Sequence, residues 1–375
     1  MMDELKKRTW AEVSLENIEH NYRSIRNYIR SDCKFCGIVK ADAYGHGAVE
    51  VSKLLQKEGA DYLAVSCLDE ALELRKNGIV IPILILGHTP YQFTEQLIDN
   101  DITQTITCLA KAEEYAAELK RLGKTLKVHM KIDTGMSRLG FIVAGDSFDE
   151  GIDHIEKSCK FEGFDVEGIF THFAVSDEPG NENNEYTRKQ FGIFLKVIDA
   201  LKERGIEFRI RHCANTGATV NFPEMQLDMV RPGYLLYGYG DDDKKLDLKP
   251  CMRFVTTVST IKHYEAGTSI SYGCKYTTKN KERIAVLACG YADGLSRAAS
   301  GKCEFATAGG FTKQVGNICM DMCMADITDL PDVQVGSEVE LFGEKSDIRK
   351  LADAAYTIPY ELMCGVTKRV PRIYY

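Results

Sequence analysis

The residues best suited to covalent chemistry lie in the segment Lys40-Ala41-Asp42-Ala43-Tyr44-Gly45-His46-Gly47. Lys40 follows the apolar run Phe35–Val39, at the place where a strand would end and a turn begin. An apolar core beneath a strand end disfavours the charged ammonium group, and a neutral amine can form a Schiff base. Gly45 and Gly47 allow a sharp turn and a close approach of the backbone to a ligand. A solvated lysine before a glycine turn fits the same short segment, so the wider chain has to decide.

Length and composition indicate a soluble, globular protein with two domains. The 375 residues exceed what a single core ordinarily fills, and 44% of them are hydrophobic and 27% charged. The net charge of −8 disfavours nucleic acid or an anionic membrane as the main partner. No apolar run is long enough to span a bilayer, and Met1–Arg8 is not followed by the apolar stretch of a signal peptide. We therefore expect a cytoplasmic protein.

Thirteen cysteines are a high and odd number. In a cytoplasmic protein most are expected to be reduced and to act as small apolar fillers of the core. Cys33 and Cys36 have the CxxC spacing, but Cys36 lies inside a strand-like run and no second ligand pair accompanies it. The pattern therefore favours neither a metal site nor a redox site.

Apolar segments recur with an α/β rhythm over the first two thirds of the chain. Eight runs have the composition of strands: Phe35–Lys40, Tyr62–Ser66, Ile81–Leu86, Thr103–Thr107, Leu126–Asp133, Val166–Phe173, Phe208–Asn215 and Asp228–Arg231. Helix-like stretches, such as Leu109–Leu122 and Tyr186–Arg204, separate them. Strands that alternate with helices form parallel sheets, and eight such units fit a closed (β/α)8 barrel. An open doubly wound sheet is the alternative, which the absence of a GxGxxG motif after the first strand disfavours.

Polar residues follow the ends of several of these strands. They are Lys40, Arg138, His172, Asn215 with Thr216, and Arg231. In (β/α)8 barrels the carboxyl ends of the strands form one face, and that face carries the chemistry. The positions of these residues therefore predict a functional site at the mouth of the barrel.

The chain changes character after about Gly240. The charged segment 241–245 is typical of a solvated connector. Short alternating runs follow, with one helical stretch at Ser346–Ala355; the runs are Phe254–Ile261, Ile284–Leu287, Cys303–Ala306 and Val339–Leu341. We expect a barrel domain over residues 1–243 and a β-rich domain over residues 244–375. An N-terminal strand near residues 8–14 is expected to become part of the β-rich domain.

Four segments stand out in the second region. They are Ser271-Tyr272-Gly273, Gly290-Tyr291-Ala292-Asp293-Gly294-Leu295-Ser296-Arg297, Gly316-Asn317-Ile318-Cys319-Met320-Asp321 and Ile358-Pro359-Tyr360-Glu361. Each alone is typical of a turn. Together with the Lys40 segment, and in this order, these motifs extend over nearly the whole chain. Their pattern resembles that of the alanine racemase family of fold-type III pyridoxal-phosphate enzymes.

This resemblance implies a specific chemistry for Lys40 and Tyr272. Lys40 would hold pyridoxal phosphate as an internal aldimine and then act as a base on one face of the substrate's external aldimine. Tyr272 of a partner subunit would be the base on the opposite face, so the family pattern implies a homodimer. An ordinary tyrosine, with a pKa of about 10, is a poor base at neutral pH until neighbouring groups favour its anion. By the resemblance, His172 would be such a neighbour and would hydrogen-bond that phenol. The family's reaction interconverts L-alanine and D-alanine, and D-alanine supplies cell-wall peptidoglycan.

The resemblance also implies a set of binding residues. Arg231 would donate a hydrogen bond to the pyridine nitrogen of the cofactor without protonating it, since a guanidinium keeps its proton. Arg138 and the backbone N–H of Met320 would bind the substrate carboxylate. Lys131 matches a lysine that carries a carbamate in many relatives, although an ordinary ion-pairing lysine fits equally well. The remaining cofactor-binding residues would be Tyr44, Asn215, Thr216, Gly233, Tyr234 and Tyr360.

Three positions depart from the common family pattern, and three other functions stay open. Thr216, Tyr234 and Ser137 stand where serine, an aliphatic residue and glycine are frequent, which could alter local packing or the turn. A racemase for serine or for a broad range of amino acids is the main alternative, although Tyr360 and Met320 favour a tight pocket. A decarboxylase and a non-catalytic pyridoxal-phosphate carrier are the others, and such carriers resemble only the first domain.

Overall fold

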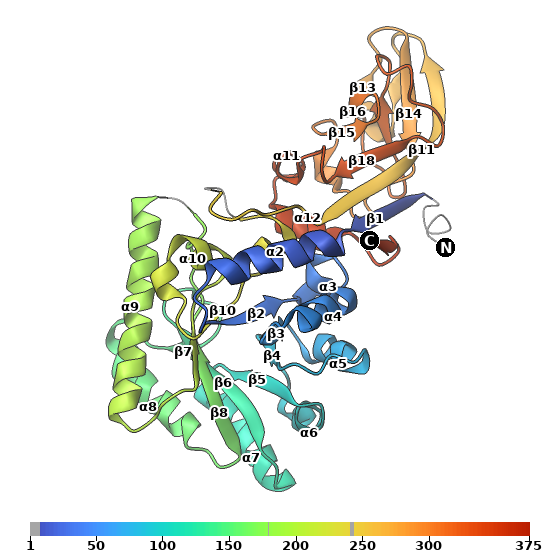
Figure 1. The fold of residues 1–375 in the computed structure, drawn as a ribbon. Helices are drawn as coiled ribbons and strands as arrows, with labels where there is room; N and C mark the ends of the chain where they lie inside the picture. Colours follow the sequence, from blue (N-terminus) through green and yellow to red (C-terminus); the bar gives the residue numbers. More distant parts are fainter. Residues whose placement is uncertain (1–7, 179, 241–243) are drawn as a thin grey trace. The chain divides into compact units, whose positions relative to one another are not determined.

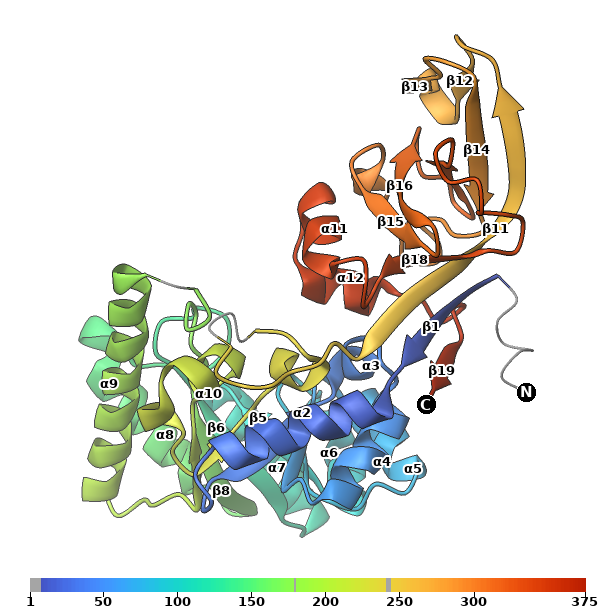
Figure 2. The same cartoon turned by 45° about the horizontal axis from the view of Figure 1, so that its top comes forward.

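The computed structural model describes residues 8–178, 180–240 and 244–375 (Figures 1 and 2). Contacts divide these residues into two units. The barrel unit comprises Glu19–Ala43 and Ala48–Lys249, and the β unit comprises the chain up to Ile18, Tyr44–Gly47 and Pro250–Tyr375. The expected connector at 241–245 and the segment Met1–Arg8 lie largely outside the described residues. No described helix is long and apolar enough to cross a membrane.

Eight parallel strands form the ring of the barrel unit. In ring order they are β2 (Lys34–Ile38), β3 (Tyr62–Val65), β4 (Ile83–Ile85), β5 (Ile102–Ile106), β6 (Leu126–Asp133), β8 (Phe164–Phe170), β9 (Ile210–His212) and β10 (Met229–Val230). The ring closes because β10 pairs with β2 and the Arg231 N–H donates to the Ala214 carbonyl oxygen, after β9, at 2.9 Å. The short strand β7 (Phe141–Ile142) pairs with β6 outside the ring. The expected (β/α)8 barrel is confirmed, and the open doubly wound sheet is excluded.

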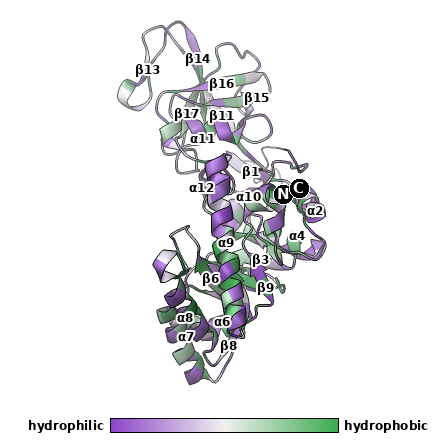
Figure 3. Ribbon diagram, turned by 90° about the vertical axis from the view of Figure 1, so that its left-hand side faces the viewer, coloured by the Kyte–Doolittle hydropathy of each residue, from purple (hydrophilic) through white to green (hydrophobic). Residues whose placement is uncertain are grey.

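Helices follow the strands and lie outside them (Figure 1). They are α2 (Leu15–Tyr28), α4 (Ala48–Glu58), α5 (Leu68–Lys76), α6 (Thr94–Asp99), α7 (Leu109–Leu122), α8 (Phe148–Cys159), α9 (Asn181–Glu203) and α10 (Thr216–Asn221). In α7 the buried residues Ala112, Tyr115 and Leu119 recur every three or four positions, so one face packs on the strands. Figure 3 shows the resulting mixture of hydrophilic and hydrophobic residues along α7, α8 and α9.

The β unit is built on one sheet of eight strands. Their order is β14 (Glu282–Leu287), β17 (Cys323–Asp326), β16 (Gly310–Val315), β15 (Glu304–Thr307), β18 (Glu338–Phe342), β11 (Met252–Tyr264), β1 (Thr9–Val13) and β19 (Arg372–Tyr374). β14 also pairs with β11, so the first six strands close a second ring. β1 pairs antiparallel with β11 and parallel with β19, and its Trp10 packs against Val255 and Ile373. The expected β-rich character of this region is confirmed.

Helix extents differ from expectation at two places. α9 begins at Asn181 rather than at Tyr186, because its polar first turn has no apolar periodicity to reveal it. The β unit contains α11 (Ile348–Ala354), as expected, but also α12 (Pro359–Gly365), so the expectation of a single helix there is wrong. α12 has only seven residues and begins with a proline, and such a segment resembles a turn in sequence.

Candidate active site

Lys40 begins a tight left-handed turn at the end of β2. In this turn, α3 (Lys40–Tyr44), φ is positive from Ala41 to Tyr44, at 52° to 54°. A residue with a Cβ loses about 1–2 kcal/mol in this conformation. Two carboxylates hold the turn. The Ala41 N–H donates to Glu70 at 2.7 Å, and the Ala48 N–H, at the start of α4, donates to Asp42 at 2.7 Å. Lys40 is thereby fixed, partly exposed, at the carboxyl end of its strand.

The two glycines of the Lys40 segment make their close approach to the chain itself. Gly45 and Gly47 have φ angles of 81° and 93°, as the expected sharp turn requires. A Cβ at Gly45 would collide with the Met363 carbonyl oxygen, and one at Gly47 would collide with the Tyr374 hydroxyl. These contacts with the C-terminal residues leave no room for a side chain at either position.

Tyr44 and Tyr360, both expected near the cofactor, lie together in the β unit. Their ring centroids are 5.9 Å apart. Tyr44 is buried, and burial raises the pKa of its hydroxyl. Tyr360 lies in the first turn of α12, the helix that was not expected from the sequence. Tyr44 therefore keeps its proton at neutral pH, and the two rings together form a mostly apolar surface with hydroxyl groups at its edge.

Four basic side chains gather with Lys40 in the barrel unit. They are Lys131, Arg138, His172 and Arg231. Lys131 is buried, with its Nζ 5.5 Å from the ring centroid of Phe170, and no described residue accepts a hydrogen bond from it. Burial, with the positive charges of Arg138 and Arg231, lowers the pKa of Lys131 to about 8. An appreciable fraction of Lys131 is therefore a neutral amine near neutral pH.

Arg231 is buried, and groups of the protein accept several of its hydrogen bonds. Its Nη1 donates to Nδ1 of His212 (2.9 Å), and its Nη2 donates to the carbonyl oxygens of Thr171 (2.8 Å) and Cys213 (3.2 Å). No carboxylate of the described residues pairs with it. Burial lowers the pKa of Arg231 to about 10, so it stays charged at neutral pH. A buried charge without a direct partner is costly, and a hydrogen-bond acceptor on a ligand would offset that cost.

His172 follows β8 and faces the same cluster. Its Nδ1 lies 3.5 Å from Nη2 of Arg231. Burial and the charges of Arg231 and Arg138 hold the pKa of His172 well below its ordinary value, so it is neutral. Because its Nδ1 faces a donor, its proton lies on Nε2. His172 is thus available as a hydrogen-bond donor to a group in front of the cluster.

Two backbone N–H groups converge on one oxygen after β9 and β10. The N–H groups of Gly233 and Tyr234 both donate to Oγ1 of Thr216, at 3.0 Å each. The Asn215 side chain caps α10 by accepting from the Ala218 N–H at 3.1 Å. Convergent N–H donors beside a hydroxyl fit a phosphate group, whose oxygen would replace or share the position of the Thr216 hydroxyl.

Arg138 is exposed and makes no hydrogen bond or ion pair with the described residues. It lines a cavity of about 340 Å³ together with Asp133 and Ser137. Ser137 has a φ of 56°, so the turn keeps a conformation that favours glycine although serine stands there. A guanidinium without a partner at the edge of a cavity is suited to bind a carboxylate.

Tyr272 and Met320 belong to the β unit, and both are exposed, at 72% and 54%. Tyr272 lies in the turn between β12 (Ser269–Ile270) and β13 (Tyr276–Thr277). Asn317 ties this turn to the Met320 loop, since its Nδ2 donates to the Tyr272 carbonyl oxygen at 2.6 Å. No acceptor in the described part of the chain takes the Met320 N–H. The Tyr272 turn and the Met320 loop are therefore adjacent, in a different unit from Lys40.

Two fully buried histidines join the site without having been expected there. His212 lies between Arg231 and His129, whose Nδ1 is 2.9 Å from Nε2 of His212. One signal in the sequence could have revealed His129. It stands two residues before Lys131 in the same strand, and such residues share a face.

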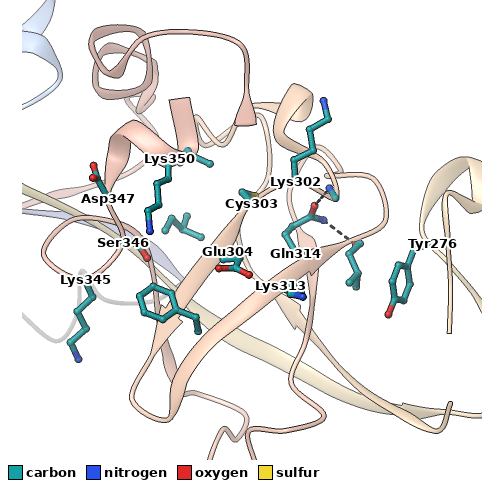
Figure 4. A pocket seen from close by; sticks show the side chains of 15 residues that line it. Tyr276, Lys302, Cys303, Glu304, Lys313, Gln314, Lys345, Ser346, Asp347 and Lys350 are labelled. Carbon is teal, nitrogen blue, oxygen red and sulfur yellow. Dashed lines mark hydrogen bonds between the residues drawn. The ribbon is translucent and has the colours of Figure 1, made fainter. Parts of the chain in front are cut away.

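A cavity of about 440 Å³ lies in the β unit (Figure 4). Its lining includes four lysines and two carboxylates: Lys302, Lys313, Lys345, Lys350, Glu304 and Asp347. In Figure 4 Glu304 lies inside it, whereas Lys302 and Lys345 extend away from its centre. None of the residues expected at the active site lines this cavity, so it is a separate feature.

The thirteen cysteines are all free. Cys33 and Cys36, the CxxC pair, are buried, and burial raises their pKa values to about 11 and about 12. Such thiols are almost wholly protonated at neutral pH and therefore poor nucleophiles. Among the described residues no group of histidine, cysteine and carboxylate side chains could hold a metal ion.

Comparison with known proteins covers both units. Residues 13–241 match the family model for the alanine racemase N-terminal domain, and residues 251–374 match that for the C-terminal domain. The chain is 44% identical to alanine racemase 2 of Caldanaerobacter subterraneus subsp. tengcongensis, over 100% of this chain and 96% of that protein. It is 42% identical to alanine racemase 1 of Clostridium acetobutylicum, over 97% and 95% of the two chains.

Solved structures agree with these matches. The alanine racemase of Clostridium difficile 630 has a TM-score of 0.92 at 44% identity, over 98% of this chain and 96% of that one. The alanine racemase of Bacillus anthracis with bound L-Ala-P has a TM-score of 0.87 at 35% identity, over 98% and 95%. The matches confirm the resemblance found in the sequence, and with it an amino-acid racemase that depends on pyridoxal phosphate. The chain belongs to the alanine racemase family.

Proposed function

We propose that this chain interconverts L-alanine and D-alanine, with Lys40 and Tyr272 exchanging protons with the substrate from opposite faces. The observation that carries the proposal is the cluster of basic groups with Lys40 at the carboxyl ends of the barrel strands. Positive charge at this place favours an anionic cofactor together with the carboxylate of a substrate.

The residues of the cluster divide between binding and orientation of the cofactor. Pyridoxal phosphate, when bound, supplies the electron sink for the charge left when the substrate loses its α-proton. Lys40 would hold it covalently, and Arg231 would donate a hydrogen bond to its pyridine nitrogen without giving up a proton. By the family resemblance, the residues that would hold the phosphate group are Tyr44, Asn215, Thr216, Gly233, Tyr234 and Tyr360.

A second copy of the chain supplies Tyr272, so the active form is a homodimer. The support is the exposure of both Tyr272 and Met320, with Tyr272 on a turn that Asn317 holds in place. His172, with its proton on Nε2, donates to the Tyr272 oxygen and favours the phenolate, which is the base. Lys40 takes or returns the proton on the other face.

Arg138 and the Met320 N–H bind the substrate carboxylate. Neither has a partner within the described residues, so both are available to it. Lys131 carries carbon dioxide as a carbamate, which would place an anion beside Arg138 and orient its guanidinium. The pKa of about 8 supports this modification, because only a neutral amine attacks carbon dioxide, with release of a proton. Incubation with 13C-bicarbonate should give a carbamate 13C signal that Lys131→Met lacks.

Mixed dimers test the sharing of the site. Lys40→Ala and Tyr272→Phe are each inactive alone, but a mixed dimer has one site with both Lys40 and Tyr272 intact. Random mixing by denaturation and refolding should therefore restore about a quarter of wild-type activity, since half of the dimers are mixed and each has half of its sites. Two inactive proteins that stay inactive on mixing would contradict a shared site.

A serine or broad-specificity racemase is the second candidate. Tyr360 and Met320 favour a small side chain, so kcat/KM should be highest for alanine among alanine, serine and lysine. One additional group on the side chain shifts selectivity by about 1–3 kcal/mol, so some activity on serine is expected. Absence of cofactor-dependent D-alanine from L-alanine would overturn the whole proposal. A cytoplasmic location, supply of D-alanine to peptidoglycan and the domain boundary at 243/244 stay predictions.

A further inference from the structure

A chain of hydrogen bonds crosses the inside of the barrel unit from Arg231 to Glu167. Nη1 of Arg231 lies 2.9 Å from Nδ1 of His212, and Nε2 of His212 lies 2.9 Å from Nδ1 of His129. Nε2 of His129 then lies 3.0 Å from Oε2 of Glu167. The Tyr62 hydroxyl donates to the same carboxylate oxygen. Side chains from five parts of the ring are therefore linked in one line.

The two ends of this chain fix the protons along it. A guanidinium only donates, so Nδ1 of His212 accepts and the His212 proton lies on Nε2. That proton faces Nδ1 of His129, which also accepts, and the His129 proton therefore lies on Nε2 and faces Glu167. A carboxylate only accepts, so all the bonds run in one direction, from Arg231 to Glu167.

Neither histidine can take a second proton without setting two donors against each other. Burial lowers the pKa of both His129 and His212, and the charge of Arg231 lowers both further. Burial would raise the pKa of Glu167, but the hydrogen bonds from His129 and Tyr62 outweigh it and lower that pKa to about 2. The chain thus has a positive end, two neutral imidazoles and a negative end.

The backbone is shaped to make the last bond of the chain. Val128 pairs with Val166, but His129 pairs with Gly168, which leaves Glu167 as the additional residue of a β-bulge. A bulge changes the direction of the side chain it carries. Gly168 leaves room for the imidazole, since a Cβ there would lie 2.6 Å from Cε1 of His129.

We propose that Glu167 is the counter-ion of Arg231 and positions its guanidinium through His129 and His212. Arg231 is buried, no described carboxylate touches it, and its hydrogen bonds lead to the charge of Glu167. Because the Glu167 carboxylate has no proton to donate, it keeps both histidines in the form that offers Arg231 a lone pair. The catalytic consequence rests on the proposed function, in which Arg231 faces the cofactor ring. Glu167 is then a positioning residue that touches neither cofactor nor substrate.

A surface ion pair supplies the matched control. Nη2 of Arg209 lies 3.9 Å from Oε1 of Glu167, the oxygen that His129 does not use. If Glu167 served mainly this pair, the loss of Arg209 would disturb the site as much as the loss of the Glu167 charge. Arg209→Gln therefore separates the two roles.

The protons of the chain can be observed without cofactor, by 15N NMR of histidine-labelled protein. In the wild-type chain His129 and His212 should each show a bare Nδ1 and a protonated Nε2, unchanged from about pH 5.5 to about pH 8. A proton on either Nδ1, or titration of either ring in that range, would overturn the proposal.

Glu167→Gln keeps the shape of the side chain but adds an NH2 group that can face His129. A second set of His129 and His212 signals, with the proton on Nδ1, should then appear. kcat should fall by about 10- to 100-fold, with KM for alanine little changed because Arg138 still binds the carboxylate. Arg209→Gln should stay within about twofold of wild type in kcat, with unchanged histidine signals. Unchanged signals in Glu167→Gln, or an equal loss in Arg209→Gln, would sink the assignment.

Gly168→Ala acts on the same bond by a second route, in case Glu167→Gln does not fold. Its Cβ displaces the His129 ring while every charge is kept, so the histidine signals and kcat should again change, and no change would contradict the proposal. The NMR result is independent of the reaction. A protein with the expected proton positions but without racemase activity would overturn the proposed function and leave the hydrogen-bond assignment standing.

Discussion

The barrel unit and the β unit present their expected site residues in opposite ways. In the barrel unit Lys131 and Arg231 are buried, and neighbouring charges and hydrogen bonds have already set their protonation. In the β unit Tyr272 and Met320 are exposed at 72% and 54%. Residues of the first kind are prepared by their own chain, whereas residues of the second kind need another surface to surround them.

This difference separates two sources of catalytic power. The barrel unit fixes charge, because burial and like charges decide which amines hold a proton. The β unit fixes position, because Asn317 and the flanking strands β12 and β13 hold the Tyr272 turn while its side chain stays uncovered. Substitutions in the barrel unit should therefore alter protonation and cofactor binding, and those in the β unit should alter turnover in the assembled form.

The largest effect is expected for Lys40→Ala. The substitution removes the amine that binds the cofactor covalently, so racemase activity should fall by at least about 10,000-fold and the visible-edge absorbance of the Schiff base should disappear. Lys34→Ala is the control, since Lys34 is an exposed lysine of the same strand that pairs with Asp61 at 3.8 Å. Retained absorbance in Lys40→Ala would exclude Lys40 as the attachment point.

Tyr272→Phe should lower turnover, which depends on the β unit, and leave cofactor binding by the barrel unit unchanged. The phenol oxygen is the proposed second base, and loss of such a group costs about 100- to 10,000-fold in rate. The Schiff-base absorbance should stay as in the wild type, because the cofactor is held elsewhere. Tyr356→Phe, at another exposed tyrosine of the β unit, should leave turnover unchanged. Equal turnover in Tyr272→Phe and wild type would remove Tyr272 from the mechanism.

Lys131 should make stability depend on pH in cofactor-free protein. Its pKa is about 8 when folded and about 10.4 when unfolded, so between these values the unfolded chain binds more protons. The free energy of unfolding should therefore gain on the order of 2 kcal/mol from this group as pH rises from about 8 to about 10.4. Urea unfolding in carbon-dioxide-free buffer should show this gain in wild type and not in Lys131→Met. Identical pH slopes would contradict the lowered pKa.

The smallest effect is expected for Ser137→Gly, beside Arg138. Serine is strained at a φ of 56°, and glycine is not, although glycine also stabilises the unfolded chain entropically. The net gain should be about 0.5 kcal/mol or less, visible as a small rise in Tm. If the stiffer serine turn helps to hold Arg138, KM for alanine should rise in this variant. Such a rise would support the view that the barrel unit positions its own binding residues. A clear fall in Tm would show that the serine is not strained.

The sequence was most informative where periodicity and strand ends coincide. The eight ring strands and the position of Lys40 at the end of β2 follow from alternating apolar runs, and the structure has each of them. The burial of Lys131 does not follow from its strand, in which polar and apolar residues alternate from Leu126 to Asp133. Its lowered pKa comes from that burial and from the charges of Arg138 and Arg231.

Contacts between distant segments could not be predicted in the same way. Ala41, Asp42 and Ala43 give no sign of positive φ, because a hydrogen bond from the Ala41 N–H to Glu70, far along the chain, helps to hold that conformation. The closure of the β ring depends on β14 pairing with β11, which the alternation in either strand does not specify. The link from His129 to Glu167 depends on a bulge, and one additional residue in a strand leaves no mark in composition.

The left-handed turn after Lys40 has a consequence for how the reactive amine is carried. Glycine would occupy the same angles with less strain, but it has many other conformations of similar energy, whereas alanine in this region has a single narrow one. With alanine at Ala41 and Ala43, the folded chain therefore carries more backbone strain, but the backbone next to Lys40 has fewer alternative conformations. The side chain of Lys40 therefore extends from a backbone that has few alternative conformations.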